Sequence, residues 1–262
     1  PMLHWLRERV EQSSCVVSYN GKTFDWPLLR NRFVMNRVKA PPLPPHLDLL
    51  QCARRILRSR MKSVRLFELE RRVLGMYRED DISGALIPQL YFDYLDGGEV
   101  APMAKVIEHN ANDLIALAAL VATLVHHFDE VHGGDDPRDH LAYAKVAERT
   151  GDASRARSFA SAAARGGGRS ECTVEACLLA ARIARRDGAL DDEERALLDA
   201  LASADSGELR AGVSLALAKF YEHRRKDLAR ALEHATQTSL AEGDDGRARR
   251  VSRLERRLSR QR

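Results

Sequence analysis

The stretch CVVSYNGKTFDWPLL, residues 15–29, decides how the first half of this chain folds. It opens with a short β-prone run, residues 15–19, and continues through the turn-forming residues 20–22. Asp25 and Pro27 then stand where a helix begins, because aspartate favours helix starts and proline fits a first turn. Strand, turn and helix in this order place Asp25 beside the carboxyl end of a strand, where ligands bind in open α/β sheets. The alternative is that Asp25 merely caps the helix.

A second segment with candidate chemistry is HNANDLIAL, residues 109–117. His109 and Asp113 are four residues apart, so a helix places them on one face, one turn apart. The apolar run 114–125 that follows is too short to span a bilayer and predicts a buried helix. A carboxylate beside a buried helix is costly unless it is paired or metal-bound, and His109 is a candidate general base. The alternative is a His–Asp pair that caps the domain surface.

Composition predicts two domains, 1–128 and 140–262, joined by a linker at 129–139. The linker is rich in glycine and aspartate, which interrupt regular structure. Eight of the nine prolines and both tryptophans precede it. After it, alanine, arginine, leucine and acidic residues dominate with a helical period.

The first domain shows a mixed pattern. Strands are predicted at 15–19 and 46–50. Helices are predicted at 3–11, from 25 to about 37, from 50 to 58, at 64–74, at 88–94 and at 101–128. Two strands do not form a stable sheet alone. Either this domain is helical with a small ribbon, or further strands lie outside this sequence.

The second domain shows weak internal repetition. Pairs of Ala/Leu-rich helices are interrupted at 148–152, 184–188 and 222–227. Aspartates in these breaks are 35 and 40 residues apart, at Asp152, Asp187 and Asp227. Helix pairs at this interval suggest a tetratricopeptide-like array, whose unit is about 34 residues. The alternative is a generic series of helical hairpins. Either architecture offers a surface for a protein partner.

The charge is concentrated at one end of the chain. Net charge is +4, yet residues 247–262 hold eight arginines and one glutamate, or +7, which leaves about −3 for the rest. This tail is either a solvated end or a segment that binds nucleic acid by counterion release. A third interpretation is that the tail docks on its own domain, because Val251, Leu254 and Leu258 share helical spacing.

The cysteines and the opening residues bear on location. Four cysteines in a chain of 262 residues do not form a disulfide framework. Cys172 and Cys177 have no histidine near them, so a zinc site is not expected. The opening residues lack the pattern of a secretory signal. We therefore expect a cytoplasmic protein, and no membrane partner.

Together, these segments resemble the YprB-like ribonuclease H-like domains of bacteria, within the DEDD superfamily of 3′–5′ exonucleases. The matching blocks, in order, are 19–29, 46–50 with 53–55, 69–70 with 73–75, 80–84 with 87–88, and 109–117. The resemblance covers about residues 1–128. It implies an α/β fold, a partial ribonuclease H-like domain lacking its first strands, before the all-α tetratricopeptide-like domain.

The resemblance also implies a mechanism, two-metal phosphodiester hydrolysis of DNA or RNA with Mg²⁺ or Mn²⁺. By match to the family's motifs, Asp25 and Asp113 are metal ligands and catalytic residues. His109 orients or deprotonates the attacking water. Its four-residue offset from Asp113 is that of the subgroup with a tyrosine at this place, whereas the histidine subgroup usually has five.

Nucleic-acid contacts are expected beside these residues. Asn20 and Lys22 are placed to touch the substrate backbone, and Asp48 is interpreted as structural or as a support for the ligands. Arg54 and Arg55 begin a basic stretch that reaches phosphates without reading sequence. The alternative for this stretch is a solvated helix face.

One departure from the family pattern limits the expected activity. The first motif of the family, an Asp-x-Glu on the opening strand, is absent from this sequence. We therefore expect residues upstream of Pro1, and we expect the chain as given to bind metal poorly and to cut little. The rival hypotheses are a degenerate nuclease fold that binds nucleic acid or protein through its helical repeats, and a purely structural helical scaffold.

Overall fold

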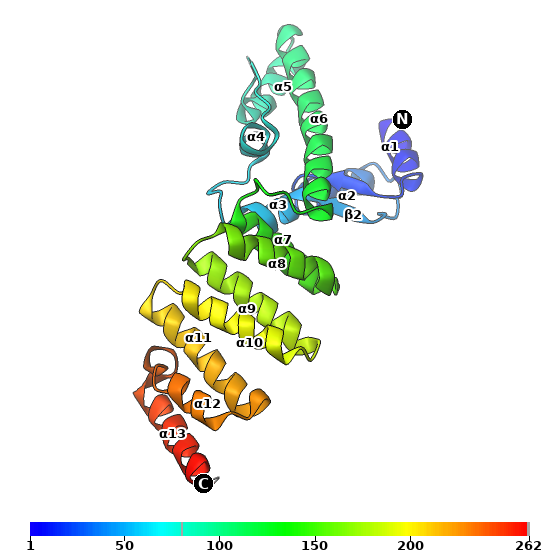
Figure 1. Cartoon of the computed structure of the whole chain (residues 1–262). Coiled ribbons are helices and arrows are strands. Elements are labelled where there is room, and N and C mark those ends of the chain that lie inside the picture. Colours follow the sequence, from blue (N-terminus) through cyan, green and yellow to red (C-terminus); the bar gives the residue numbers. More distant parts are fainter. Residues whose placement is uncertain (80, 261–262) are drawn as a thin grey trace. The chain divides into compact units, whose positions relative to one another are not determined.

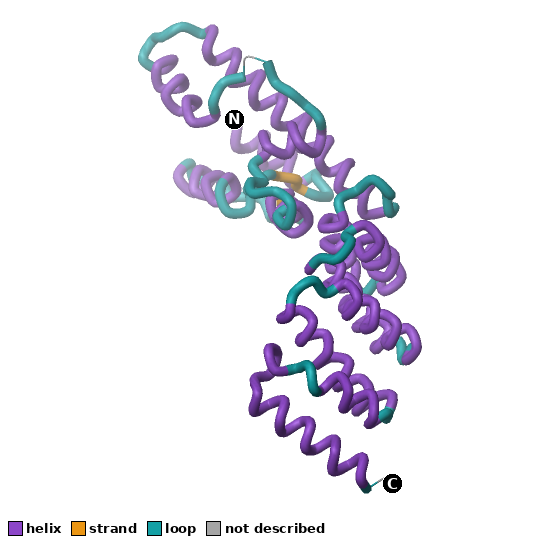
Figure 2. Tube along the Cα trace, turned by 60° about the vertical axis from the view of Figure 1, so that its left-hand side comes forward, coloured by secondary structure: helices purple, strands orange, loops and turns teal. Residues whose placement is uncertain are grey.

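The computed structural model describes residues 1–79 and 81–260 and divides the chain into two compact units, Pro1–Glu130 and Val131–Arg262. Both units are mostly helical (Figure 1). The strands of the described residues lie in the first unit (Figure 2). Asp80, part of one block of the family resemblance, lies outside the described residues.

The first unit is built around a parallel pair of strands. β1 (Val16–Ser18) pairs with β2 (His46–Asp48), with Val16 opposite His46 and Ser18 opposite Asp48. Parallel strands need a crossover connection, and α2 (Asp25–Met35) lies within it. Both strands were predicted from sequence, and each is two residues shorter than predicted.

Helices make up most of the rest of the first unit. In the first unit they are α1 (Met2–Glu11), α3 (Leu49–Leu57), α4 (Leu66–Leu69), the π-helical turn η1 (Glu70–Leu74), the 3₁₀ turn η2 (Gly84–Leu86), α5 (Ile87–Leu95) and α6 (Ala101–Asp129). Gly75 ends η1 with a left-handed backbone, φ 65°, as its place after the predicted helix indicated. The long helix α6 packs against α4, η1 and α5 (Figure 1).

The prediction that the apolar run in α6 is buried is wrong for much of its surface. Ala116, Leu120 and Leu124 are buried, whereas Leu114 and Ile115 are 60% and 57% exposed. The reason is that the neighbouring elements α4, η1 and α5 cover only part of the helix. At 29 residues, α6 is also long and apolar enough to cross a membrane by length and composition, a test that core helices of soluble proteins also pass.

The second unit is a series of helices. They are α7 (Pro137–Thr150), α8 (Ala153–Gly166), α9 (Glu171–Arg186), α10 (Leu190–Ser203), α11 (Gly207–Phe220), the π-helical turn η3 (Tyr221–Arg225), α12 (Leu228–Ala235) and α13 (Ser239–Ser259). Neighbours in sequence pack on one another through the series. Figure 1 shows α7 to α13 following one another in space in the order of the chain.

Each break predicted in this region ends a helix through local backbone chemistry. The chain turns at residues with positive φ, namely Gly151 (83°), Gly188 (73°) and Lys226 (61°). The side chains of Asp152 and Asp227 then accept hydrogen bonds from backbone N–H groups at the start of α8 and α12. Aspartate thus begins the second helix in two of the three pairs.

The core of the second unit closes around Tyr221. This side chain is almost fully buried, and its hydroxyl donates to Glu194 Oε1 at 2.7 Å. Its ring stacks on His234 with centroids 5.5 Å apart. A buried tyrosine needs such a partner, because an unpaired hydroxyl in a core is costly.

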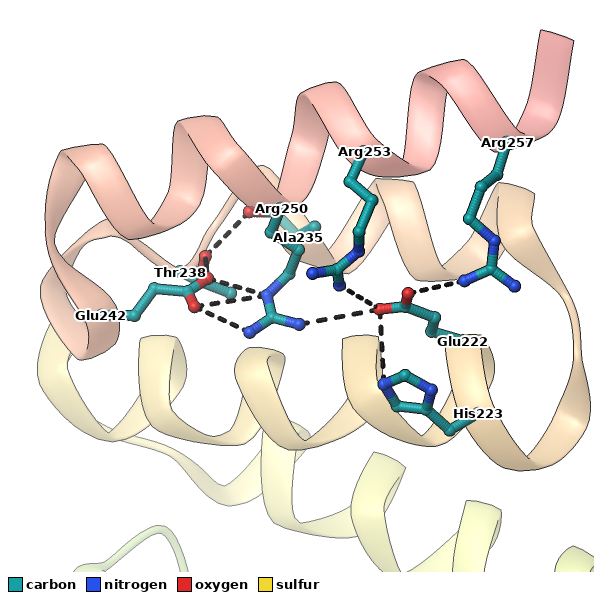
Figure 3. Close-up of polar contacts among 8 residues, drawn as sticks. All are labelled: Glu222, His223, Ala235, Thr238, Glu242, Arg250, Arg253 and Arg257. Carbon is teal, nitrogen blue, oxygen red and sulfur yellow. Dashed lines mark hydrogen bonds and ion pairs between the residues drawn. The ribbon is translucent and has the colours of Figure 1, made fainter.

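The Arg-rich tail docks on its own unit as helix α13. Leu254 is fully buried, and Val251 and Leu258 pack against the same apolar cluster. Buried Glu222 lies beneath the helix and accepts from Arg253 and Arg257 at 2.7 Å each (Figure 3). Of the three interpretations of the tail, docking therefore describes its structure, and two of its arginines are bound to an internal acid.

A second acid extends this network. Arg250 donates to Glu242 at 2.8 Å and lies 3.7 Å from Glu222, so it joins the two carboxylates (Figure 3). Burial would raise the pKa of Glu222, but the hydrogen bond and charge of Arg253, with His223 and Arg257, outweigh it and hold that pKa below its usual range. Glu222 is thus ionised in the folded protein.

Replacing Glu222 with glutamine is predicted to weaken the second unit. The free energy of unfolding should fall by about 2 kcal/mol. This is less than the ~3–5 kcal/mol lost when a fully buried ion pair is broken, because Arg253 and Arg257 reach water. The lowered pKa gives stability that is present above about pH 4.3 and lost as pH falls through the folded value. The difference between wild type and Glu222→Gln should therefore vanish in acid.

The measurement is urea unfolding followed by far-UV circular dichroism at pH 7 and pH 3. Both tryptophans, Trp5 and Trp26, lie in the first unit, so their fluorescence should not change in this variant. The exposed Glu255 on the same helix supplies the matched control, Glu255→Gln. Equal stability of Glu222→Gln and Glu255→Gln at pH 7 would show that the ion pairs of Glu222 do not stabilise the second unit.

Candidate functional site

Asp48 fixes the loop that follows β1. Its side chain is 3% exposed and accepts three backbone hydrogen bonds, from Asn20 (2.9 Å), Lys22 (3.0 Å) and Leu50 (3.1 Å). The carboxylate therefore joins the loop after β1 to the start of α3. The sequence interpretation of Asp48 as structural agrees with this position, because a carboxylate that serves three N–H groups orders backbone.

The loop itself is tightly folded. Asn20 has a left-handed backbone, φ 66°, and its side-chain oxygen accepts from Thr23 at 2.7 Å. A Cβ on Gly21 would lie 2.5 Å from Ser18, so only glycine fits without a shift. Ser18 in turn lies 2.7 Å from His46 on the neighbouring strand. The loop is thus held from both strands.

Asp25 leaves this loop as the first residue of α2. The N-cap residue is Phe24, and no side chain caps the helix. The interpretation of Asp25 as an N-cap is therefore wrong, and its side chain is exposed beside the loop. Asp25 lies close to Gly21, because a Cβ atom added to Gly21 would be 3.4 Å from Asp25 Oδ2. Asp25 is left available for another role.

A basic pocket opens beside the same loop. Its volume is about 440 Å³, and its lining includes Asn20 and Arg54. Three further cations line it, namely Arg58, Lys62 and Arg65. No acidic residue belongs to this lining among the described residues, so the pocket suits an anion such as a phosphate. Lys22 and Arg55, also predicted to contact nucleic acid, are exposed and lie outside this lining.

Tyr19 is part of the lining of this pocket. Its hydroxyl donates to the carbonyl of Val64, another lining residue. Burial raises the pKa of Tyr19 to about 12, although the charge of Arg54 opposes it. The tyrosine therefore stays neutral and acts as a donor.

The second group of candidate residues meets at α6. His109 and Asp113 lie one turn apart, with His109 Nε2 3.7 Å from Asp113 Oδ2. Arg78 donates to Asp113 at 2.6 Å and to Asp81 at 3.0 Å. It also donates to the buried Glu70 of η1. One guanidinium therefore joins three carboxylates from three parts of the unit.

Histidine completes this group, which we call the Arg78 cluster: Glu70, Arg78, Asp81, His109 and Asp113. His109 Nδ1 lies 2.8 Å from Asp81 Oδ1. Burial would raise the pKa of Asp81, but hydrogen bonds from His109 and Arg78 lower it. Burial would likewise lower the pKa of Arg78, but its bonds to Glu70, Asp113 and Asp81 raise it. Arg78 is thus held by three carboxylates, and Asp81 is held by both Arg78 and His109.

The described residues do not form a metal site by themselves. Within residues 1–79 and 81–260, no group of three or more His, Cys, Asp or Glu side chains is arranged to hold a metal ion. One oxygen of Asp113 is already bound to Arg78, and no described contact joins Asp25 to Asp113. The described contacts therefore bring His109 and Asp113 together, and Asp25 does not take part in them.

Sequence reasoning missed Arg78 and Asp81 as members of the site. Both lie in the irregular segment between η1 and η2, where no periodicity predicts which side chains turn inward. A weak signal was present, because Asp81 and Glu70 both belong to blocks of the family resemblance. The partner of those acids could not be inferred from spacing.

Comparison with known proteins agrees with this fold. Residues 1–125 match the family described as the RNase_H superfamily. Over 255 residues the chain is 29% identical to the protein named "Uncharacterized protein YprB" of Bacillus subtilis (strain 168). That alignment covers 93% of this chain and 60% of the relative, so the chain spans about 60% of the relative's length. No solved structure matches the chain.

The Arg78 cluster predicts a strong effect for Arg78→Gln. Removing the guanidinium leaves Glu70, Asp81 and Asp113 facing one another without a cation, which should destabilise the first unit by about 3 kcal/mol at pH 7. Stability from the lowered pKa of Asp81 is present above about pH 3.9 and is lost as pH falls through the folded value. The cost of the variant should therefore shrink in acid.

Tryptophan fluorescence during urea unfolding measures this unit selectively, since Trp5 and Trp26 lie within it. The control is Arg72→Gln, which removes an arginine that is 65% exposed and paired only at the surface with Glu68. If the destabilisation by Arg78→Gln does not depend on pH, or is no larger than that by Arg72→Gln, the Arg78 cluster contributes little to the stability of the first unit.

Proposed function

We propose that residues 1–128 are the larger part of a metal-dependent 3′–5′ exonuclease domain that acts on DNA or RNA. In this proposal Asp25 and Asp113 are metal ligands, and His109 orients or deprotonates the attacking water. The observation that carries the proposal is the match of residues 1–125 to the RNase_H superfamily, together with the His109–Asp113 pair on α6.

The proposed metal ions are Mg²⁺ or Mn²⁺, which favour oxygen ligands and suit phosphodiester hydrolysis. Two carboxylates do not balance two such ions, and the described residues lack a complete metal site. We therefore propose that the active domain includes two further carboxylates from residues upstream of Pro1. The chain as given is expected to have little activity by itself.

The basic pocket beside the loop supports a polynucleotide substrate. Arg54, Arg58 and Arg65 gather at a single pocket near Asn20, on the same loop that leads to Asp25. Cations arranged in this way bind phosphates and position a strand without reading its bases. The loop is held rigid by Asp48, so the pocket and Asp25 keep a constant spacing.

A degenerate nuclease fold is the second candidate function, and one observation favours it. Arg78 binds one oxygen of Asp113, and the same guanidinium pairs with the neighbouring acid Asp81. In this candidate, the first unit binds nucleic acid and the helical unit binds a protein partner, without hydrolysis. The presence or absence of an Asp-x-Glu upstream of Pro1 separates the two candidates.

The proposed activity is tested with this chain extended by the residues encoded directly upstream of Pro1. A 5′-labelled single-stranded oligonucleotide, DNA or RNA, should be shortened stepwise from its 3′ end when Mn²⁺ is added. Asp113→Ala and Asp25→Ala should each lower the rate by more than about 100-fold, the upper end of what loss of a metal's outer-shell partner costs. Asp96→Ala, at an exposed aspartate of the same unit, should keep the rate.

The same assay tests the basic pocket. Arg54→Glu should raise KM with little change in kcat, because its charge is proposed to hold substrate rather than to act on it. Arg32→Glu, at an exposed arginine of α2 outside the pocket, is the matched control. Hydrolysis that survives Asp113→Ala would overturn the proposed ligands, and absence of hydrolysis in the extended protein would favour the degenerate fold.

A further inference from the structure

The second unit contains a pocket that the nuclease proposal does not use. Its volume is about 400 Å³, within the range of about 300–1,000 Å³ typical of ligand sites. Residues from α9, α10, α11 and η3 line it. The pocket therefore lies where two successive pairs of helices meet.

Positive charge dominates the rim of this pocket. Arg182 and Arg185 project from α9, Lys219 from α11 and Arg224 from η3. The one acid in the lining is Glu193, which accepts from Arg224 at 2.8 Å. Four cations and one carboxylate leave an excess of three positive charges, counting the nearby histidine as neutral.

Part of this charge has no acceptor within residues 1–79 and 81–260. Arg182 lies 3.3 Å from Glu148 and is partly neutralised. In contrast, Nη2 of Arg224 is buried and makes no hydrogen bond to the described residues. Arg185 is exposed and lines the pocket. A group with carboxylates would supply the missing acceptors.

The floor of the pocket is apolar. Leu197 and Phe220 are buried and form part of the lining, together with the partly buried Leu178. A polynucleotide backbone would need cations along an extended track, because its charges repeat along the strand. A compact pocket with an apolar floor and a cationic rim instead matches an apolar side chain flanked by acidic residues.

The wall formed by η3 is held rigidly in place. Glu222, next to His223 and Arg224, is fixed by Arg253 and Arg257 of α13, as Figure 3 shows. His223 Nε2 lies 3.6 Å from the same carboxylate and lines the pocket. The pocket is thus largely formed before any ligand binds, which lowers the entropy cost of binding.

We propose that this pocket binds an acidic peptide segment of a partner protein, with an apolar side chain on Leu197 and Phe220 and flanking carboxylates on Arg185, Lys219 and Arg224. The charge complementarity between this rim and an acidic segment sets specificity and association rate. The site is independent of the proposed nuclease residues, so it can be tested without nuclease activity.

The experiment measures the fluorescence anisotropy of the labelled peptide Glu-Glu-Leu-Phe-Glu-Glu with the 262-residue chain at low salt. Saturable one-to-one binding is expected, and added salt should weaken it. Arg185→Glu should raise Kd by about tenfold, and adding Lys219→Gln should raise it further. Arg149→Glu, at an exposed arginine of α7 outside the pocket, should leave Kd unchanged.

A second peptide and a single-stranded oligonucleotide test which ligand features the pocket recognises. Glu-Glu-Gly-Gly-Glu-Glu should bind at least about tenfold more weakly, because it lacks the side chains that would bury apolar surface. Equal binding of the two peptides, equal Kd for Arg185→Glu and Arg149→Glu, or no binding at all would overturn the proposal. Tighter binding of a single-stranded oligonucleotide that is lost in Arg185→Glu would also overturn it, since the occupant would then be nucleic acid. Circular dichroism of each variant verifies that the fold is retained.

Discussion

Carboxylates that face one another inside a protein must share a cation, and in the first unit that cation is the guanidinium of Arg78. It bonds Glu70 of η1, Asp81 after the turn and Asp113 of α6, and it lies 3.4 Å from His109 Nδ1. Without it, three acids would repel one another across a partly dry space. The position of α6 against η1, and hence of His109 and Asp113, depends on this one side chain.

The second unit has the opposite ratio of acids to arginines. There, one buried carboxylate, Glu222, serves several arginines of α13, whereas in the first unit one arginine serves several carboxylates. Both arrangements fix a helix by charge-assisted hydrogen bonds in addition to apolar contacts. The difference matters for function, because the first arrangement leaves acids near the proposed cation site and the second ties arginines of the tail to an internal acid.

Much of the fold could be predicted from the sequence because it depends on local rules. The strand at β1 follows from its β-prone residues, and the breaks of the helical unit follow from glycine and aspartate at helix ends. The docking of α13 was one of three interpretations, since the spacing of Leu254 and its neighbours does not reveal its partner. Asp48 was interpreted as structural or as a support for the ligands, but two of its three backbone bonds come from a loop 26 to 28 residues earlier in the chain.

The rest could not be predicted because it depends on contacts between distant segments. Arg78 and Asp113 are 35 residues apart, and the segment that carries Arg78 has no period. The exposure of Leu114 and Ile115 depends on how much of α6 its neighbours cover, which composition does not reveal. The N-cap interpretation of Asp25 was wrong because Asp25 is itself the first residue of α2, with Phe24 in the capping place.

The central claim is that Asp25 and Asp113 bind the same metal ions. The most direct measurement is paramagnetic broadening of backbone amide resonances when substoichiometric Mn²⁺ is added to the ¹⁵N-labelled chain, extended by the residues encoded directly upstream of Pro1. If the account is right, amides around Asp25 and around Asp113 lose intensity together, and Asp113→Asn abolishes the broadening at both places. Broadening at only one of the two segments, or broadening near Asp25 that persists in Asp113→Asn, would contradict it.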